Sequence, residues 1–284
     1  MNMSNGGEHP QRPARKHRVA RTQLTEDKLQ SSSEYLKVSQ THKQKGISPM
    51  LGGLVPYSSP QAQPLTTIIA GTCTLIFCLS LVVPGDGVVN LFGLSWMNTL
   101  MGKFYVWNLV TGSFVETNLL KAAVGAAGIG LLGPTTEESL GQVGGLMYIL
   151  IVAAASGVVS SCSLFTIYVI TRYEHILSIA IYGSLGLVMA MAVACVQSHQ
   201  HSTPLRHLPV LAATISGALH VAGLSAISHD FPFVCVGPYA GWVYLRFFHR
   251  YDSGRVGDTS EAFQLVKFFP AQLAPVLQPL SDFA

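Results

Sequence analysis

The sequence predicts an all-α membrane protein, a bundle of six transmembrane helices, and three observations support this. Of the 284 residues, 49% are hydrophobic and only 11% are charged, whereas soluble domains average roughly 25% charged residues. Apolar runs near the roughly 20 residues that a bilayer-crossing helix needs recur from residue 65 onward. Nine of the seventeen Lys and Arg residues lie before residue 50, ahead of those runs. Three regions are therefore expected: 1–64, 65–249 and 250–284.

The N-terminal region, 1–64, combines clustered Arg and Lys with scattered Gly, Pro and Ser, and it shows no helical or strand period. Such a composition buries too little apolar surface to offset the entropy cost of ordering, so we expect disorder. Its charge favours the cytosolic side of a membrane and anionic lipid rather than nucleic acid. A sorting or coat-binding signal is the alternative interpretation of the basic run.

Six apolar segments are expected to span the membrane. The first, 65–83, begins beyond the window of a cleavable signal peptide and should remain as a signal anchor. The stretch that follows it, up to Met101, is amphipathic and should lie at the interface. The remaining spans are expected at 107–132, 142–170, 175–196, 208–227 and 233–248, with a loop at 134–139. The 29-residue run 142–170 should need a tilt, or a kink near Ser156 and Gly157.

An even number of spans places both termini on one side of the membrane. Under the positive-inside rule that side is the cytosol, because it holds the nine N-terminal basic residues and those of the C-terminal tail. The opposite loops contain only Lys103 and Arg172. Both termini are therefore expected to be cytosolic, with a disordered basic N-terminus and a short, ordered C-terminal tail.

Polar residues within the expected spans are candidate functional groups, because ionisable side chains are costly in a bilayer. Glu116 and Asn118 lie in the expected second span, with Lys121 nearby. Glu116 either bonds loop backbone near the end of the span or contributes to a polar pocket. The five cysteines lie in apolar runs without a CxxC pair, which is typical of inert core residues. The His-rich loop around Pro204 matches no ligand spacing, so no metal or cofactor is expected.

The last apolar segment and the tail carry a recognisable motif. Small residues at its start suit close helix packing, and the aromatic and basic residues that follow suit the membrane boundary. The motif residues are Trp242, Tyr244 and Arg246, then Gly257 and Asp258, then Phe268, Phe269 and Pro270. With this motif the chain resembles the transmembrane protein 115 family, which is considered rhomboid-like. We expect the first three to anchor the span and the others to form a docked segment, with Asp258 paired to Arg255 or Lys267.

The rhomboid-like plan raises the question of proteolysis. Active rhomboids carry a Gly-x-Ser-Gly serine on the fourth span and an Ala-His motif on the sixth, and a serine nucleophile needs a base within hydrogen-bond reach. Here Gly-x-Ser-Gly is absent, and Tyr182 takes the nucleophile position with Ser184 two residues away, about 200° around a helix. The sixth span contains no histidine before His249 at its end. After the Trp of the first loop, Gly112 stands where many rhomboids and their relatives carry a histidine. An active protease using Ser184 and His220 is the alternative.

The resemblance implies a Golgi membrane protein without protease activity, acting as an adaptor in retrograde transport from the Golgi to the endoplasmic reticulum. The partners it implies are membrane lipids, transmembrane cargo and Golgi tethering or coat proteins, and a second copy of the chain stays open. A channel or transporter would need a polar path through the bundle. Glu116, Lys121 and His220 offer one only weakly, because the spans are otherwise apolar.

Overall fold

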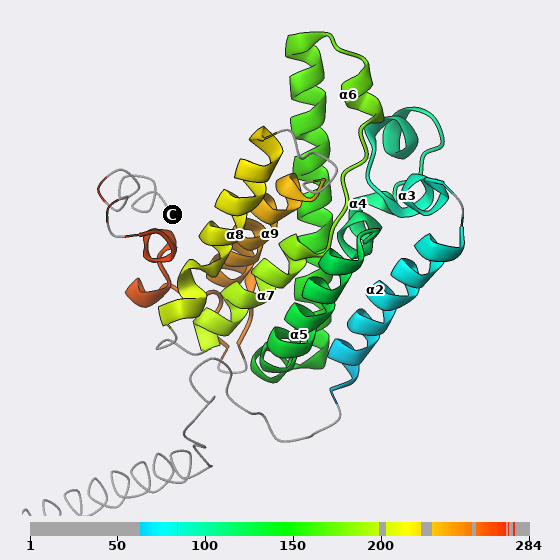
Figure 1. Cartoon of the computed structure of the whole chain (residues 1–284). Helices are drawn as coiled ribbons and strands as arrows, with labels where there is room; N and C mark the ends of the chain where they lie inside the picture. The colour runs from blue at the N-terminus through cyan, green and yellow to red at the C-terminus, as the bar shows by residue number, and fades with distance from the viewer. Residues whose placement is uncertain are drawn as a thin grey trace, which may run out of the picture. The chain divides into compact units, whose positions relative to one another are not determined.

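The computed structural model describes residues 63–83, 85–198, 203–222, 229–251 and 254–270, together with Gln272 and Pro275. The disorder expected for 1–64 concerns residues that lie almost wholly outside this set. Within it the chain is helical, and its only β features are isolated bridges. Figure 1 shows the helices. Their bounds are α2 Pro64–Val82, α3 Gly87–Phe92, α4 Asn108–Thr111, α5 Leu119–Thr171, α6 His175–Ser178, α7 Leu185–Ser198, α8 Thr203–Val221 and α9 Phe231–Val243.

Helix α5 consists of two arms that meet at Gly141, where the chain reverses direction (Figure 1). Gly141 has φ 72° and ψ 168°, a conformation outside the helical range that glycine adopts readily. The predicted loop at 134–139 is therefore wrong, because the first arm stays helical through Pro134 and turns only at Gly141. The predicted start of the next segment at residue 142 agrees with the second arm. No break interrupts that arm at Ser156 or Gly157.

Two predicted helix starts are also wrong. The second span was expected from Trp107, but α4 is a separate short helix, and α5 begins only at Leu119. The fourth was expected from His175, but α7 begins at Leu185 after the short α6 and an extended segment. The backbone of Ile181 exchanges hydrogen bonds with the first loop, at 2.7 and 3.0 Å, which holds that segment out of a helix.

Helix α7 lies at the centre of the bundle, between α5, α8 and α9 (Figure 1). Every residue from Gly186 to Val196 is buried. The contact with α9 is made backbone to backbone, because a methyl group added at Gly186 would overlap the carbonyl of Phe233, and one at Gly237 would overlap the carbonyl of Gly186. Small residues at crossing points allow such close approach between membrane helices.

The predicted number of spans is not settled by helix length. In the described part of the chain two helices, α2 and α5, are long and apolar enough to cross a membrane by length and composition. Helix α7 is apolar but has only 14 residues. Helix α9 continues through a π-helical turn to Phe248, in agreement with the predicted end of the last segment. The predicted segment 208–227 overlaps α8, and its residues 223–227 lie outside the described set. Six spans therefore remains a prediction.

The cysteines are not uniformly core residues, as had been expected. Cys73 and Cys195 are buried, whereas Cys78, Cys162 and Cys235 are exposed. In an apolar bundle surrounded by lipid, exposed cysteines can face hydrocarbon rather than water, because the bilayer core is itself apolar.

The buried carboxylate of Glu137 connects α5 to the first turn of α2. Its oxygens accept hydrogen bonds from the backbone N–H groups of Leu65 and Thr66 at 3.4 and 3.0 Å, and from the Thr66 hydroxyl at 3.1 Å. The first N–H groups of a helix have no partner within it, and the helix dipole favours an acceptor with negative charge there. Glu137 thus caps a helix that lies some seventy residues earlier in the chain.

We predict that Glu137→Ala destabilises the folded chain by about 2 kcal/mol, because it leaves buried donors of α2 without an acceptor. Thermal unfolding of the purified protein in detergent measures the effect. The neighbouring Glu138→Ala serves as the matched control, since Glu138 is exposed and makes no such cap. Equal destabilisation by the two substitutions would contradict the capping role.

Candidate functional site

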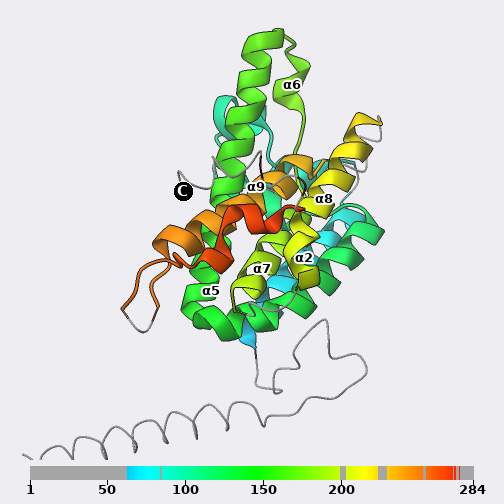
Figure 2. The ribbon, with the colours of Figure 1, turned by 90° about the vertical axis from the view of Figure 1, so that its left-hand side faces the viewer.

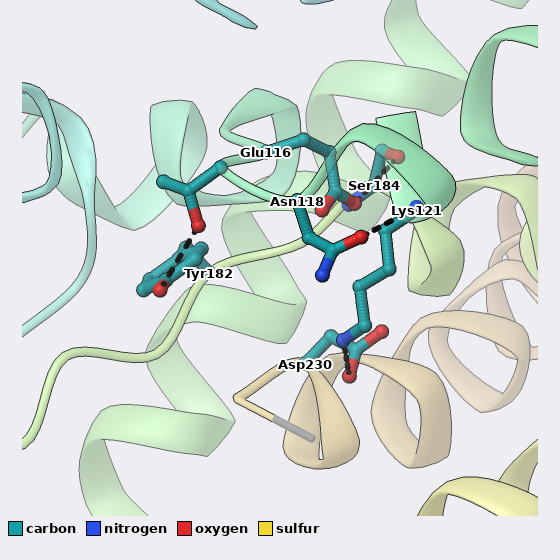
Figure 3. Close-up of polar contacts among 7 residues, drawn as sticks. Glu116, Asn118, Lys121, Tyr182, Ser184 and Asp230 are labelled. Atoms are coloured by element: carbon teal, nitrogen blue, oxygen red, sulfur yellow. Dashed lines mark hydrogen bonds and ion pairs between the residues drawn. The ribbon is translucent and has the colours of Figure 1, made fainter. Parts of the chain in front are cut away.

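The polar residues of the candidate site gather where α5, α7 and α9 begin (Figure 3). Glu116 lies in the loop before α5, and Ser184 directly precedes α7. The Oε1 atom of Glu116 accepts the backbone N–H of Ser184 at 2.7 Å and its hydroxyl at 2.9 Å. Both side chains are buried. Glu116 therefore supplies an acceptor at the start of α7, where the first N–H groups have no partner within the helix.

A second carboxylate occupies the start of α9. Asp230 is buried at the N-cap position, and its Oδ1 atom lies 2.7 Å from the ammonium group of Lys121 on α5. Asn118 caps α5 itself, because its side-chain oxygen accepts from the N–H groups of Leu120 and Lys121 at 2.9 and 3.4 Å. Figure 3 shows Lys121 extending towards Asp230 while Glu116 turns towards Ser184. Each polar residue here thus satisfies a helix start or pairs with another charge.

The hydroxyl of Ser184 is committed to Glu116 rather than to an imidazole. The helix that packs beside it, α9, contains no histidine and presents Phe233 and Gly237 to α7. A methyl group on Gly125 of α5 would overlap the Ser184 oxygen, so the hydroxyl is packed against backbone. The group within hydrogen-bond reach of this serine is therefore a carboxylate, whereas the rhomboid plan places an imidazole there.

His220 and Tyr182 have other surroundings than those predicted. His220 is exposed in the last turn of α8, and its ring stacks on Phe231 with centroids 5.6 Å apart. Tyr182 lies in the extended segment before α7, so the predicted offset of 200° around a helix from Ser184 is wrong. The Tyr182 phenol accepts from Thr117 at 3.3 Å, and its ring stacks on His229.

Gly112, at the position where the rhomboid plan would place a histidine, is closely surrounded. Its carbonyl accepts the N–H of Gly183 at 3.0 Å. A methyl group on Gly112 would lie 3.3 Å from Leu94 and from Phe233. Tight packing therefore leaves no room here for an imidazole without displacement of these neighbours.

We predict that Glu116→Ala destabilises the bundle by about 2 kcal/mol, because two buried donors of Ser184 lose their acceptor. Glu116→Gln keeps a side-chain oxygen at the same position, so we expect it to retain most of the stability. Thermal unfolding in detergent distinguishes the two variants. Comparable losses in both would show that the charge, and not the acceptor geometry, holds α7 in place.

The predicted tail motif folds back onto the end of α9 (Figure 2). The indole N–H of Trp242 donates to the carbonyl of Phe263 at 2.9 Å. The guanidinium of Arg246 donates to the carbonyls of Asp258 and Ser260, both at 3.1 Å. The described part of the tail is thus held by hydrogen bonds from side chains of the last helix.

Gly257 allows the tail to turn directly against this helix. Its φ of +70° is unfavourable for other residues, and a methyl group there would overlap the carbonyl of Arg246. The N–H of Gly257 donates to the carbonyl of His249 at 2.8 Å, and that of Asp258 to Leu245 at 3.2 Å. The positive φ and the close approach to Arg246, which these bonds maintain, explain why a glycine occupies this position of the motif.

The predicted pairing of Asp258 with Arg255 or Lys267 is wrong. Its carboxylate accepts from the backbone N–H of Ser260 at 3.0 Å and from the amide of Gln197 at 3.3 Å, and no ion pair joins it among the described residues. Burial raises the pKa of Asp258, but these bonds together with Arg246 outweigh burial and hold it below its usual value. Asp258 therefore acts as an acceptor that ties the tail to α7.

The aromatic part of the motif joins the main core. Phe263 and Phe268 are buried there and contact each other edge to face, with centroids 5.8 Å apart. The carbonyl of Phe268 lies 3.0 Å from Nδ1 of His207 on α8. Phe269 packs at the margin of the core and Pro270 is exposed. Tyr244 also packs there, beside Tyr148. The motif residues therefore come together in one intramolecular contact.

Three residues of the site, Asp230, Gln197 and Phe263, were not predicted from the sequence. Asp230 had a usable signal, because an Asp followed by Pro within the first helical turn is a typical helix start. Gln197 and Phe263 had none, since each acquires its role only when the tail meets α7 and α9.

Comparison with known proteins agrees with the resemblance inferred from the motif. Transmembrane protein 115 of Mus musculus is 27% identical over 192 residues, which cover 63% of this chain and 53% of that protein. Rhomboid-like protein 19 of Arabidopsis thaliana is 26% identical over 184 residues, which cover 62% of this chain and 60% of that protein. The chain thus spans little more than half the length of these relatives. A family model described as eukaryotic integral membrane protein (DUF1751) matches residues 67–284, and the chain belongs to that family.

Proposed function

We propose that the chain is a non-proteolytic, rhomboid-like membrane adaptor that binds transmembrane cargo for retrograde transport from the Golgi to the endoplasmic reticulum. The observation that carries the non-proteolytic part is the bonding of Ser184. Its hydroxyl donates to Glu116, and α9 offers no histidine beside it. A bundle in this state can bind a helix without cutting it.

A groove between α5 and α8 supports binding of cargo within the membrane. It has a volume of about 290 Å³, its floor includes Met189 of α7, and its α8 wall includes Ala212 and Ile215. Apolar side chains predominate in its lining, while the Lys121–Asp230 ion pair lies at the end where α9 begins. Packing and an occasional polar contact are what hold transmembrane helices together.

The Golgi assignment and the cytosolic placement of both termini rest on the family resemblance and on the distribution of basic residues. The curated relatives are named as a transmembrane protein and a rhomboid-like protein. With both termini cytosolic, the docked tail would face tethering or coat proteins while the groove faces cargo. Immunofluorescence beside Golgi markers, with protease protection of terminal tags, tests this arrangement.

Capture and cleavage assays distinguish an adaptor from the alternative, a protease that uses Ser184 and His220. Membranes would contain the full chain and a photo-crosslinkable single-span cargo. An adaptor should form the crosslink without a cleavage product, and Ala212→Trp should reduce crosslinking. Ala218→Trp is the matched control, since Ala218 is on α8 but does not line this groove. A cleavage product that disappears in Ser184→Ala and His220→Ala would overturn the proposal in favour of the protease.

A further inference from the structure

A larger groove lies on the other side of α8, between α8 and α9. Its volume is about 590 Å³, within the range of roughly 300–1,000 Å³ that is typical of small-molecule sites. One wall presents Pro209, Ala213 and Gly217, which recur every four residues and so share one face of α8. The opposite wall, on α9, includes Tyr239 and Trp242. This groove is separate from the one proposed for cargo.

The walls of this groove are suited to hydrocarbon. Among the residues that the structure describes, no carboxylate, Lys or Arg lines it. Thr214 lines it, but its hydroxyl donates to the carbonyl of Val210 within α8 at 2.8 Å. This donor therefore does not need a hydrogen-bond acceptor on the ligand. Tyr239 and Cys235 are exposed along α9, so the groove opens on the outer surface of the bundle. In an integral membrane protein that surface meets lipid chains.

One end of the groove is formed by the tail, and two basic residues are close in sequence to the residues that line it. Leu265, Phe268 and Phe269 line it there, and the bond between His207 and the Phe268 carbonyl joins the tail to the start of α8. Lys267 is exposed directly beside Phe268. Arg206 lies one helical turn before Val210, on the face of α8 that lines the groove. Arg206 and Lys267 are not among the lining residues, but Lys267 is adjacent in sequence to one and Arg206 is one helical turn from another.

We propose that this groove binds one acyl chain of an anionic phospholipid, with the headgroup phosphate beside Arg206 and Lys267. The pairing of an apolar channel with basic residues at one end matches the pairing of chain and anionic headgroup in such a lipid. A transmembrane helix is the less suitable occupant. It would have to pass Leu265, Phe268 and Phe269, the tail residues that line one end of this groove.

Trp242 provides a direct probe, because its indole lines the groove. In a Trp96→Phe, Trp107→Phe background it is the only tryptophan of the chain. The full chain in phosphatidylcholine nanodiscs would receive increasing fractions of lipid with brominated acyl chains, either phosphatidylserine or phosphatidylcholine. Bromine quenches indole emission on contact. Each titration gives the fraction of brominated lipid at which quenching is half-maximal. We expect this fraction to be at least about fivefold lower for brominated phosphatidylserine than for brominated phosphatidylcholine.

Two sets of variants test the two halves of the site. Ala213→Phe fills the groove and should reduce quenching by brominated phosphatidylserine, whereas Ala218→Phe, on α8 but outside the groove, should not. Arg206→Gln and Lys267→Gln should each reduce the preference for phosphatidylserine about fivefold.

Equal quenching by the two lipids in the parent chain would overturn the proposal, as would unchanged quenching in a folded Ala213→Phe. If Ala213→Phe does not fold, an unchanged preference in Lys267→Gln, whose side chain is exposed, overturns it.

Discussion

Gly186→Leu is expected to prevent assembly of the bundle. At this position the backbone of α7 touches the backbone of α9, and even a methyl group would overlap the carbonyl of Phe233. Overpacking a tight core commonly costs 1–3 kcal/mol, and a leucine that forces two backbones apart should cost more than about 3 kcal/mol. Yield of monodisperse protein in detergent, followed by thermal unfolding, measures the loss.

Gly71→Leu is the matched control for this substitution. Gly71 is exposed on α2, and a methyl group added there would meet open space. Replacement of a helical glycine by a better helix former should be neutral or slightly stabilising, by about 0.5 kcal/mol. If both leucine variants fail alike, the close approach of α7 and α9 is not what Gly186 provides.

Gly257→Ala is expected to release the tail from the end of α9. The methyl group would overlap the carbonyl of Arg246, and alanine would also have to adopt a φ of +70°. A strain of roughly 1.5–3 kcal/mol corresponds to at least about a tenfold shift towards the undocked tail. Limited proteolysis with trypsin measures this shift, because Lys267 follows the turn and should be cut at least about ten times faster.

Gly254→Ala separates the two causes of that effect. Gly254 also has a positive φ, of +79°, but a methyl group there would meet open space. Its alanine variant should therefore carry the backbone strain without the collision, and cleavage at Lys267 should rise less. Equal acceleration in both variants would mean that strain alone governs docking. Unchanged cleavage in Gly257→Ala would contradict the docked arrangement.

The helical fold could be predicted from the sequence because apolar runs dominate the composition, but the positions of helix ends could not. Pro134 resembles a helix stop, yet α5 continues through it, and a bundle can tolerate a proline where neighbouring groups replace the lost bond. The actual reversal is at Gly141, one of 27 glycines. Nothing local distinguishes a glycine at a reversal from one at a helix crossing, such as Gly186.

The candidate site was predictable as a set of residues but not as a set of contacts. Glu116 stands out because a carboxylate amid apolar sequence needs a partner, but its partner Ser184 is 68 positions away. Ser184 and His220 resemble a catalytic pair through motif echoes alone. The extended segment ahead of α7, held by its pairing with Leu94, gives Ser184 a different neighbour.

The contact between the tail and α9 makes the tail and the bundle thermodynamically linked. Trp242 and Arg246 belong to the last helix, whereas the carbonyls that they bind belong to the tail. A soluble partner that recognises the docked form would raise the melting temperature of the helices, because ligands stabilise the state they bind. A partner that needs the same segment extended would bind more weakly, by the free energy required to break these bonds. Recognition at the membrane surface and stability within the membrane are therefore two measures of a single equilibrium.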